Sequence, residues 1–230
     1  NSNILAISAP LSDISPSKVN AGIVEVYDVS DLDNPSLLGG KLEGADSEEK
    51  FGFSIDISND GKILAVGSPG NDNNGFVSIY KLENNSWSLL GKRISGNNNS
   101  FGWALNLENN GLRIAIGDPY YDLTEGFENV GSVDIYEFNE ESGDSGLWEK
   151  LGQSIYGTEP NSNFGFSLDF DNNIVAIGAP QKDLENKSGF ASIYHLNDNL
   201  FIQLGDNITG EENTDESGAS ISLTSPNNEL

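Results

Sequence analysis

Two tyrosines beside a carboxylate form the group in this sequence that is best suited to binding a ligand. Tyr120, Tyr121 and Asp122 are consecutive in a loop that also contains Glu125 and Glu128. A tyrosine ring offers a flat apolar face with a polar tip, and a carboxylate accepts hydrogen bonds. This combination suits sugar rings and their hydroxyls, so we expect a carbohydrate-binding loop. The alternative is an ordinary loop with partly buried tyrosines.

An aspartate recurs three residues after a proline in four corresponding loops. The four residues are Asp13, Asp72, Asp122 and Asp183. Carboxylates gathered on one face of the molecule would suit a cation or another ligand, because calcium takes six to eight oxygen ligands. The alternative is a shared structural role, since aspartate side chains organise turns by accepting hydrogen bonds from nearby backbone.

The residues needed for familiar catalytic constellations are scarce. Cysteine is absent and His195 is the single histidine, so neither a thiolate nucleophile nor a convincing Ser-His-Asp triad is expected. Carboxylates are abundant, but glycoside hydrolysis needs two of them at a set separation across a cleft. Clusters such as Glu211 and Glu212 precede the repeat starts, where solvated charge is the simpler interpretation. The sequence therefore predicts that the chain is not an enzyme.

The formal net charge of −25 narrows the range of partners. Such a surface repels phosphate backbones and anionic lipid, so nucleic-acid binding is not expected. No apolar run approaches the roughly 18 residues that cross a bilayer, so membrane insertion is not expected either. The remaining partners are proteins, carbohydrates, divalent cations or further copies of the chain.

Four sequons for N-glycosylation occur, at Asn84, Asn98, Asn186 and Asn207. They matter only if the protein is secreted from a eukaryote.

These candidate residues lie in a fourfold repeat. Three repeats begin with Phe-Gly, at Phe51, Phe101 and Phe164, and a weaker start lies at Ser217. Each start is followed by a polar turn, an apolar run that ends in proline, a run that ends in tyrosine, and a Leu-Gly segment. We divide residues 1–230 into one domain with repeats at about 1–50 joined by 217–230, then 51–100, 101–163 and 164–216.

Each repeat is expected to form four short antiparallel strands. Runs such as Ile63 to Gly67 are apolar on both faces and must be covered on both sides. Sheets stacked around an axis cover both faces, whereas a sandwich covers one. Repeats of roughly 40–50 residues with four strands each are typical of propellers. The predicted fold is an all-β propeller with four-stranded antiparallel blades.

The repeat resembles the FG-GAP family of integrin-α-like propellers. The elements that match are Phe51-Gly52 with Gly67-Ser68-Pro69, Phe101-Gly102 with Gly117-Asp118-Pro119, and Phe164-Gly165 with Gly178-Ala179-Pro180. The resemblance covers essentially the whole chain and implies a propeller in an extracellular, cell-surface or virion protein.

The family's calcium loop is not present. Its Asp-rich loop is replaced by short turns such as Ser58-Asn59-Asp60-Gly61. Such turns cannot wrap an ion that wants six to eight oxygens, so no cofactor is expected from this source, although Ca²⁺ at the aspartates above stays open.

The number of blades also stays open. Residues 217–223 could complete the first repeat and close a four-bladed ring. Alternatively, the chain could be a segment of a larger propeller.

From these observations we expect a non-catalytic binding or structural module acting through protein or carbohydrate contacts on its loops. One alternative is a self-assembling fibre, shell or virion subunit. A second alternative is a polysaccharide-active enzyme that uses acidic residues.

Overall fold

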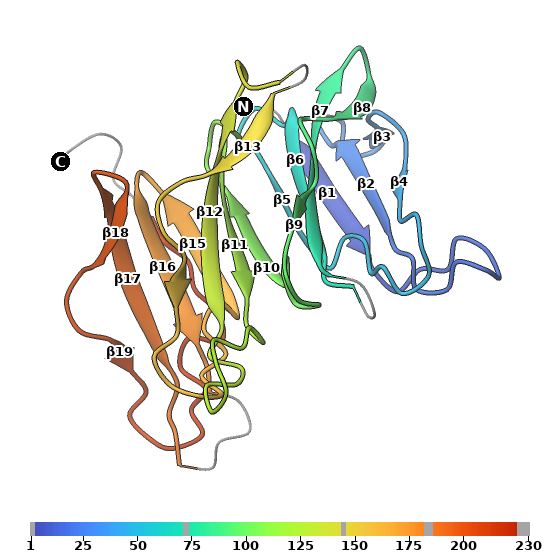
Figure 1. Ribbon diagram of the computed structural model, residues 1–230. Helices are drawn as coiled ribbons and strands as arrows, with labels where there is room; N and C mark the ends of the chain where they lie inside the picture. The colour runs from blue at the N-terminus through green and yellow to red at the C-terminus, as the bar shows by residue number, and fades with distance from the viewer. Residues whose placement is uncertain (1–2, 71–73, 144–145, 182–185, 225–230) are drawn as a thin grey trace. The chain divides into compact units, whose positions relative to one another are not determined.

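The computed structural model describes residues 3–70, 74–143, 146–181 and 186–224. Within these residues the chain is all-β, with strands β1 to β19 and no helix. The strands form four antiparallel sheets that follow one another along the chain (Figure 1). The expectation of an all-β chain of consecutive antiparallel sheets is confirmed.

The strands of each sheet are consecutive in the sequence. The first sheet contains β1 (Ile4–Ala9), β2 (Ile23–Asp28), β3 (Ser36–Leu37) and β4 (Leu42–Glu43). The second contains β5 (Ser54–Ile57), β6 (Ile63–Ser68), β7 (Phe76–Glu83), β8 (Ser86–Leu89) and β9 (Ile94–Ser95). The third contains β10 (Ala104–Leu107), β11 (Arg113–Asp118), β12 (Ser132–Asn139), β13 (Leu147–Lys150) and β14 (Ile155–Tyr156). The fourth contains β15 (Ser167–Asp171), β16 (Ile174–Ala179), β17 (Phe190–Asn197), β18 (Leu200–Gln203) and β19 (Ile208–Thr209).

The last segment of each repeat forms two short strands rather than one. In the fourth sheet β18 and β19 both pair with β17, at its two ends. Leu204 and Gly205 lie between them, and Gly205 has φ 70°. A glycine in this left-handed conformation turns the chain without a steric penalty, so the Leu-Gly motif divides the expected fourth strand.

Asparagine pairs form two of the two-residue turns between neighbouring strands. Asn84 and Asn85, between β7 and β8, have φ of 51° and 57°. Asn172 and Asn173, between β15 and β16, have φ of 48° and 66°. Two left-handed residues in succession match the twist of a hairpin, and asparagine tolerates them better than most residues.

The Phe-Gly motif is required by close packing between consecutive repeats. A Cβ on Gly117 would lie 2.2 Å from the carbonyl oxygen of Gly165, and a Cβ on Gly178 would lie 2.0 Å from that of Gly218. Gly165 and Gly218 themselves have φ of 87° and 86°. Glycine is therefore needed on both sides of the contact.

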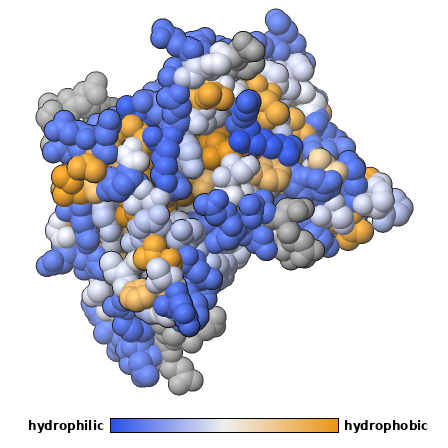
Figure 2. Space-filling model, in the orientation of Figure 1, coloured by the Kyte–Doolittle hydropathy of each residue, from blue (hydrophilic) through white to orange (hydrophobic). Residues whose placement is uncertain are grey.

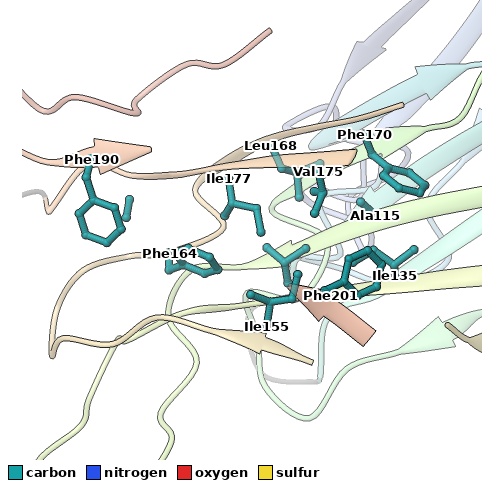
Figure 3. Close-up of a cluster of buried hydrophobic side chains, with 12 residues drawn as sticks. Ala115, Ile135, Ile155, Phe164, Leu168, Phe170, Val175, Ile177, Phe190 and Phe201 are labelled. Atoms are coloured by element: carbon teal, nitrogen blue, oxygen red, sulfur yellow. The ribbon is translucent and has the colours of Figure 1, made fainter. Parts of the chain in front are cut away.

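The chain divides into two compact units. Unit 1 comprises Asn1–Trp103, Asn109–Arg113 and Phe138–Glu149, and unit 2 comprises Ala104–Glu108, Ile114–Glu137 and Lys150–Leu230. The core of unit 2 gathers apolar side chains from the third and fourth sheets, including Ile135, Phe164, Val175, Ile177 and Phe201 (Figure 3). Unit 1 has a corresponding core around Phe51, Leu64 and Tyr80.

Residues 217–218 occupy the position of a further Phe-Gly start. Ser167 Oγ donates a hydrogen bond of 2.7 Å to the carbonyl oxygen of Gly218, as Ser54 Oγ does to that of Gly102 at 2.7 Å. The first sheet contains β1 to β4, and the described residues after 217 contain no named strand. Completion of the first sheet by the C-terminal segment stays a prediction.

The visible surface is largely polar. Figure 2 shows hydrophilic residues over most of one face, with smaller hydrophobic patches between them. In the part of the chain that the structure describes, no helix is long and apolar enough to cross a membrane.

Candidate functional site

Unit 2 contains a cavity of about 290 Å³ between the end of the third sheet and the outer strands of the fourth. Its walls carry Tyr156, Ser192, Tyr194, Gln203, Asp206 and Asn207. The volume lies just below the roughly 300–1,000 Å³ typical of ligand pockets, so it suits a small ligand of about one ring.

Alternation along β17 directs three side chains to the cavity. Phe190, Ser192 and Tyr194 all line it. Residues two apart in a strand share a face. The same strand pairs with β18 through Tyr194 and Gln203, which brings Gln203 to the same wall.

Two phenylalanines form the apolar part of the lining. Phe164 and Phe190 belong both to the cavity and to the buried core of unit 2 (Figure 3). The Phe164 ring meets the Tyr194 ring edge to face, with centroids 6.2 Å apart and an interplanar angle of 85°. The lining is therefore anchored in the core, which limits its movement.

Hydrogen bonds fix the polar wall. Ser192 Oγ and Gln203 Nε2 each lie 2.7 Å from Asn207 Oδ1, to which they donate. The Asn207 amide is thus held in one orientation, with its oxygen occupied and its nitrogen as the group offered to a ligand. A wall that is ordered before binding loses less entropy when a ligand arrives.

The Tyr194 hydroxyl is a hydrogen-bond donor at neutral pH. Burial raises the pKa of Tyr194 above its usual value of 10. Asp206, whose side chain is exposed, also lines the cavity. The cavity therefore places a potential proton acceptor and a neutral hydroxyl around one space.

An aromatic pair borders the cavity. The rings of Tyr121 and Tyr156 have centroids 5.5 Å apart and an interplanar angle of 33°. Tyr156 lines the cavity, so Tyr121 contributes a second ring beside the lining. Burial is the main cause that raises the pKa of Tyr121, and the neighbouring Tyr156 raises it further.

The tyrosine loop predicted from the sequence thus separates into three roles. Tyr121 reaches the border of the cavity through Tyr156. Tyr120 is 41% exposed and is absent from the cavity lining. Asp122 shapes the loop, because its Oδ1 accepts the backbone N–H of Asn129 at 2.7 Å. Their part in binding a ligand stays a prediction.

Asp13 has the same position as Asp122 in a matching loop of unit 1. Its Oδ1 accepts the backbone N–H of Asn20 at 2.9 Å. Asp72 and Asp183 lie outside the described residues. Among the residues that the structure describes, no group of three or more His, Cys, Asp or Glu side chains is arranged to hold a metal ion. A cation at these aspartates stays a prediction.

The sequons differ in their surroundings. Asn84 is exposed in a hairpin turn and Asn186 is exposed near the start of β17. Asn98 is half-buried, and its Oδ1 accepts hydrogen bonds from the backbone N–H and the hydroxyl of Ser100. Asn207 lines the cavity, so a glycan there would obstruct it. Glycosylation itself stays a prediction.

Unit 1 contains the same framework with different polar residues. Phe51 and Tyr80 repeat the edge-to-face geometry, again with centroids 6.2 Å apart and an angle of 85°. Phe76 pairs with Ser95 as Phe190 pairs with Thr209. By this register Lys92 and Arg93 stand where unit 2 has Asp206 and Asn207.

Most of the cavity residues escaped sequence analysis. Tyr194 falls in the tyrosine column of the repeat, whereas Tyr156 and Gln203 fall at positions where the residue varies among the repeats. Asp206 resembles an ordinary turn residue after Leu204-Gly205. A signal was present in the repeat alignment, where Asp206-Asn207 replaces the Lys92-Arg93 of the second repeat. Such a change of charge at one column marks a position that the fold itself does not fix.

Comparisons with known proteins identify the architecture. A proposed 6-phosphogluconolactonase of Bacteroides uniformis superposes with a TM-score of 0.54 at 13% sequence identity, over 85% of this chain and 51% of that chain. A proposed 6-phosphogluconolactonase of Bacteroides fragilis gives 0.51 at 13% identity, over 84% of this chain and 50% of that one. The acylaminoacyl peptidase of Pyrococcus horikoshii gives 0.50 at 13%, over 89% of this chain and 31% of that one.

The fold is propeller-like. At this level of identity the likeness speaks for the fold alone, and the chain spans about half the length of the two Bacteroides proteins. No family model matches the sequence, and no curated protein matches it significantly.

These comparisons correct the family expectation. The FG-GAP interpretation was wrong: no family model supports it, and the similar structures are lactonase-like and peptidase propellers. The physical reason is that Phe-Gly and the small residues facing it satisfy backbone packing between stacked sheets. Any propeller with equally close sheets can acquire them, so the motif does not identify a family.

The functional expectation is corrected as well. A non-enzymatic adhesion or structural module is contradicted, because the similar structures carry the names of enzymes. The expectation of a non-enzyme rested on the scarcity of histidine and cysteine, but carboxylate and tyrosine side chains can also transfer protons. The cavity instead assembles residues from Tyr156 to Asn207 through the stacking of sheets.

Proposed function

We propose that this chain carries the substrate site of a propeller hydrolase that cleaves a carbohydrate ester, with a sugar lactone as the simplest substrate. The cavity of unit 2 is the site. The observation that carries the proposal is the convergence of Asp206, Tyr194 and Tyr156 on one small space lined by hydroxyl and amide groups. The lactonase-like neighbours support the choice of reaction class.

The lining suits a sugar ring. Tyr156 offers an aromatic face, and Ser192, Gln203 and Asn207 offer groups that bond to hydroxyls. Tyr121 contributes a second ring beside the lining. Ligand sites commonly combine apolar walls with a few placed polar groups.

Hydrolysis follows from the two ionisable groups. In the proposed step Asp206 accepts a proton from a water molecule whose oxygen forms a bond to the ester carbonyl carbon. The Tyr194 hydroxyl donates a hydrogen bond to the carbonyl oxygen as negative charge develops on it. The bond from the carbonyl carbon to the ring oxygen then breaks, and the proton held by Asp206 passes to that oxygen. The product is the open-chain acid.

A single carboxylate in the lining favours ester cleavage over glycoside cleavage. Canonical glycosidases place two carboxylates on either side of the scissile bond. Among the described residues that line the cavity, Asp206 alone carries a carboxylate.

The four sheets are proposed to be consecutive blades of the propeller. The repeated glycine contacts between sheets support this arrangement within each unit.

The test is the turnover of a sugar lactone by Asp206→Asn. Loss of a general base lowers kcat by about 10²- to 10⁴-fold. Asp198→Asn is the matched control, because Asp198 lies in the exposed turn between β17 and β18, away from the cavity lining. Unchanged turnover in Asp206→Asn would remove this residue from the mechanism.

A further inference from the structure

The described cavity lining lacks the cationic side chains that most often hold phosphate. Its described residues include no lysine, arginine or histidine, whereas they do include the carboxylate of Asp206. Sugar phosphates are held by arginine and lysine side chains, by backbone amides at helix N-termini, or by metal ions. The described chain has no helix to supply the second kind of site.

The lysines in the described part of unit 2 form ion pairs elsewhere. The described part of unit 2 contains two lysines, Lys150 and Lys187. Lys150 Nζ lies 2.8 Å from Asp134 Oδ1, and Lys187 Nζ lies 2.6 Å from Glu159 Oε2. Neither ammonium belongs to the cavity lining. A bound phosphate would therefore face Asp206 with no described cation in the cavity wall to offset the repulsion.

Unit 1 shows that the framework itself permits basic residues. Lys92 and Arg93 occupy the positions of Asp206 and Asn207, and the Arg93 guanidinium carbon lies 4.5 Å from the centre of the Phe76 ring. Unit 2 replaces this basic pair by an acid and an amide. The two units therefore differ in charge at these positions because their side chains differ, while the backbone register is the same.

We infer that the site in unit 2 selects an uncharged carbohydrate and rejects a sugar phosphate. The inference rests on the proposed function, since it names the substrate class of the same cavity. It also separates this chain from the phosphorylated substrate that the names of the two Bacteroides proteins imply. The net charge of −25 also repels a sugar phosphate, over longer distances.

The first experiment compares binding of glucose and glucose 6-phosphate by ligand-observed NMR, at low and at physiological ionic strength. We expect glucose to bind at least about tenfold more tightly, because a dianion near a carboxylate is repelled. The difference between the two affinities should become smaller as salt is added, since the Debye length falls to about 8 Å at 0.15 M. Equal or tighter binding of the phosphate would overturn the inference.

A charge-reversal variant sharpens the binding test. Asp206→Lys introduces the residue that Lys92 provides in unit 1, and it should raise the affinity for glucose 6-phosphate about tenfold or more. Glu211→Lys makes the same charge change outside the cavity lining and should have a much smaller effect. Equal gains in the two variants would show that net charge, and not the site, sets the preference, and would overturn the inference.

Turnover separates this inference from the proposed function. Hydrolysis of glucono-δ-lactone faster than that of its 6-phosphate supports both. Glucose binding with no turnover of either lactone supports the selectivity and contradicts the hydrolytic function. Preferred turnover of the phosphorylated lactone supports hydrolysis and overturns the selectivity, and absence of all binding overturns both.

Discussion

The guanidinium carbon of Arg93 lies 4.5 Å from the centre of the Phe76 ring. Phe190 occupies the position of Phe76 in the fourth sheet, and there Asn207 stands in place of the arginine. Stacking on an aromatic face stabilises a guanidinium. The same framework therefore carries an arginine over its phenylalanine in unit 1 and lines a cavity in unit 2.

The first prediction concerns closure of the cavity. Asn207→Arg should place a guanidinium over Phe190 and exclude the ligand, while the fold is retained because unit 1 already accommodates this residue. We expect loss of sugar binding by NMR with little change in melting temperature. Asn197→Arg, at the exposed end of β17, is the control for charge. Normal binding in Asn207→Arg would show that the ligand binds elsewhere.

The second prediction concerns the Tyr194 hydroxyl. Tyr194→Phe should lower kcat by about 10²- to 10³-fold if the hydroxyl stabilises the developing oxyanion. Because burial raises the pKa of Tyr194 above its usual value of 10, the hydroxyl stays protonated up to about pH 9. Ionisation of Tyr194 should therefore cause no loss of wild-type activity below that pH. A pH–rate profile with a tyrosine-dependent fall near neutrality would contradict this assignment.

The third prediction concerns the packing of consecutive sheets. A Cβ at Gly165 would lie 2.6 Å from the carbonyl oxygen of Ser132 in a backbone with φ 87°. Gly165→Ala should therefore lower the free energy of unfolding by about 3 kcal/mol, because backbone strain and displacement of the neighbouring strand add together. Chemical denaturation measures the loss.

Gly126→Ala is the matched control for this variant. Gly126 also has positive φ, at 83°, but a Cβ there would meet nothing within 4 Å. Gly126→Ala should lower the free energy of unfolding by only about 1–2 kcal/mol, because it adds a side chain at positive φ without a steric clash. Equal losses in the two variants would show that the contact between sheets is not tight.

These examples show which parts of the molecule the sequence can predict. The apolar run from Ile63 to Gly67, the polar turn before it and the recurring Phe-Gly starts are local features, and each determines backbone geometry within a few residues. The strands and their grouping into sheets followed from them. The division of the last segment into two strands was missed, because a short gap at Leu-Gly leaves the apolar pattern intact.

The cavity could not be predicted in the same way. Tyr156 and Asp206 belong to different sheets, and their approach depends on how the third and fourth sheets stack. Tyr121 was identified from its neighbours, whereas its contact with Tyr156 depends on tertiary packing. Asp122 attracted attention as a ligand residue, but its carboxylate organises its own loop.

The fourth prediction addresses that loop. Asp122→Asn should retain stability within about 0.5 kcal/mol, because an amide oxygen can accept the same hydrogen bond from Asn129. Asp122→Ala should lose about 1 kcal/mol, the net contribution of one hydrogen bond in an exposed loop. Melting with and without added Ca²⁺ provides the check. A calcium-dependent stabilisation that both variants abolish would instead support a cation at this aspartate.

The most direct measurement is the rate of hydrolysis of glucono-δ-lactone by the purified chain, corrected for the uncatalysed reaction. We predict a rate that saturates with substrate and is inhibited competitively by glucose, since both would occupy the cavity beside Tyr194 and Asp206. A rate equal to the uncatalysed background at all substrate concentrations would contradict the assignment of the cavity as a hydrolytic site for this class of substrate.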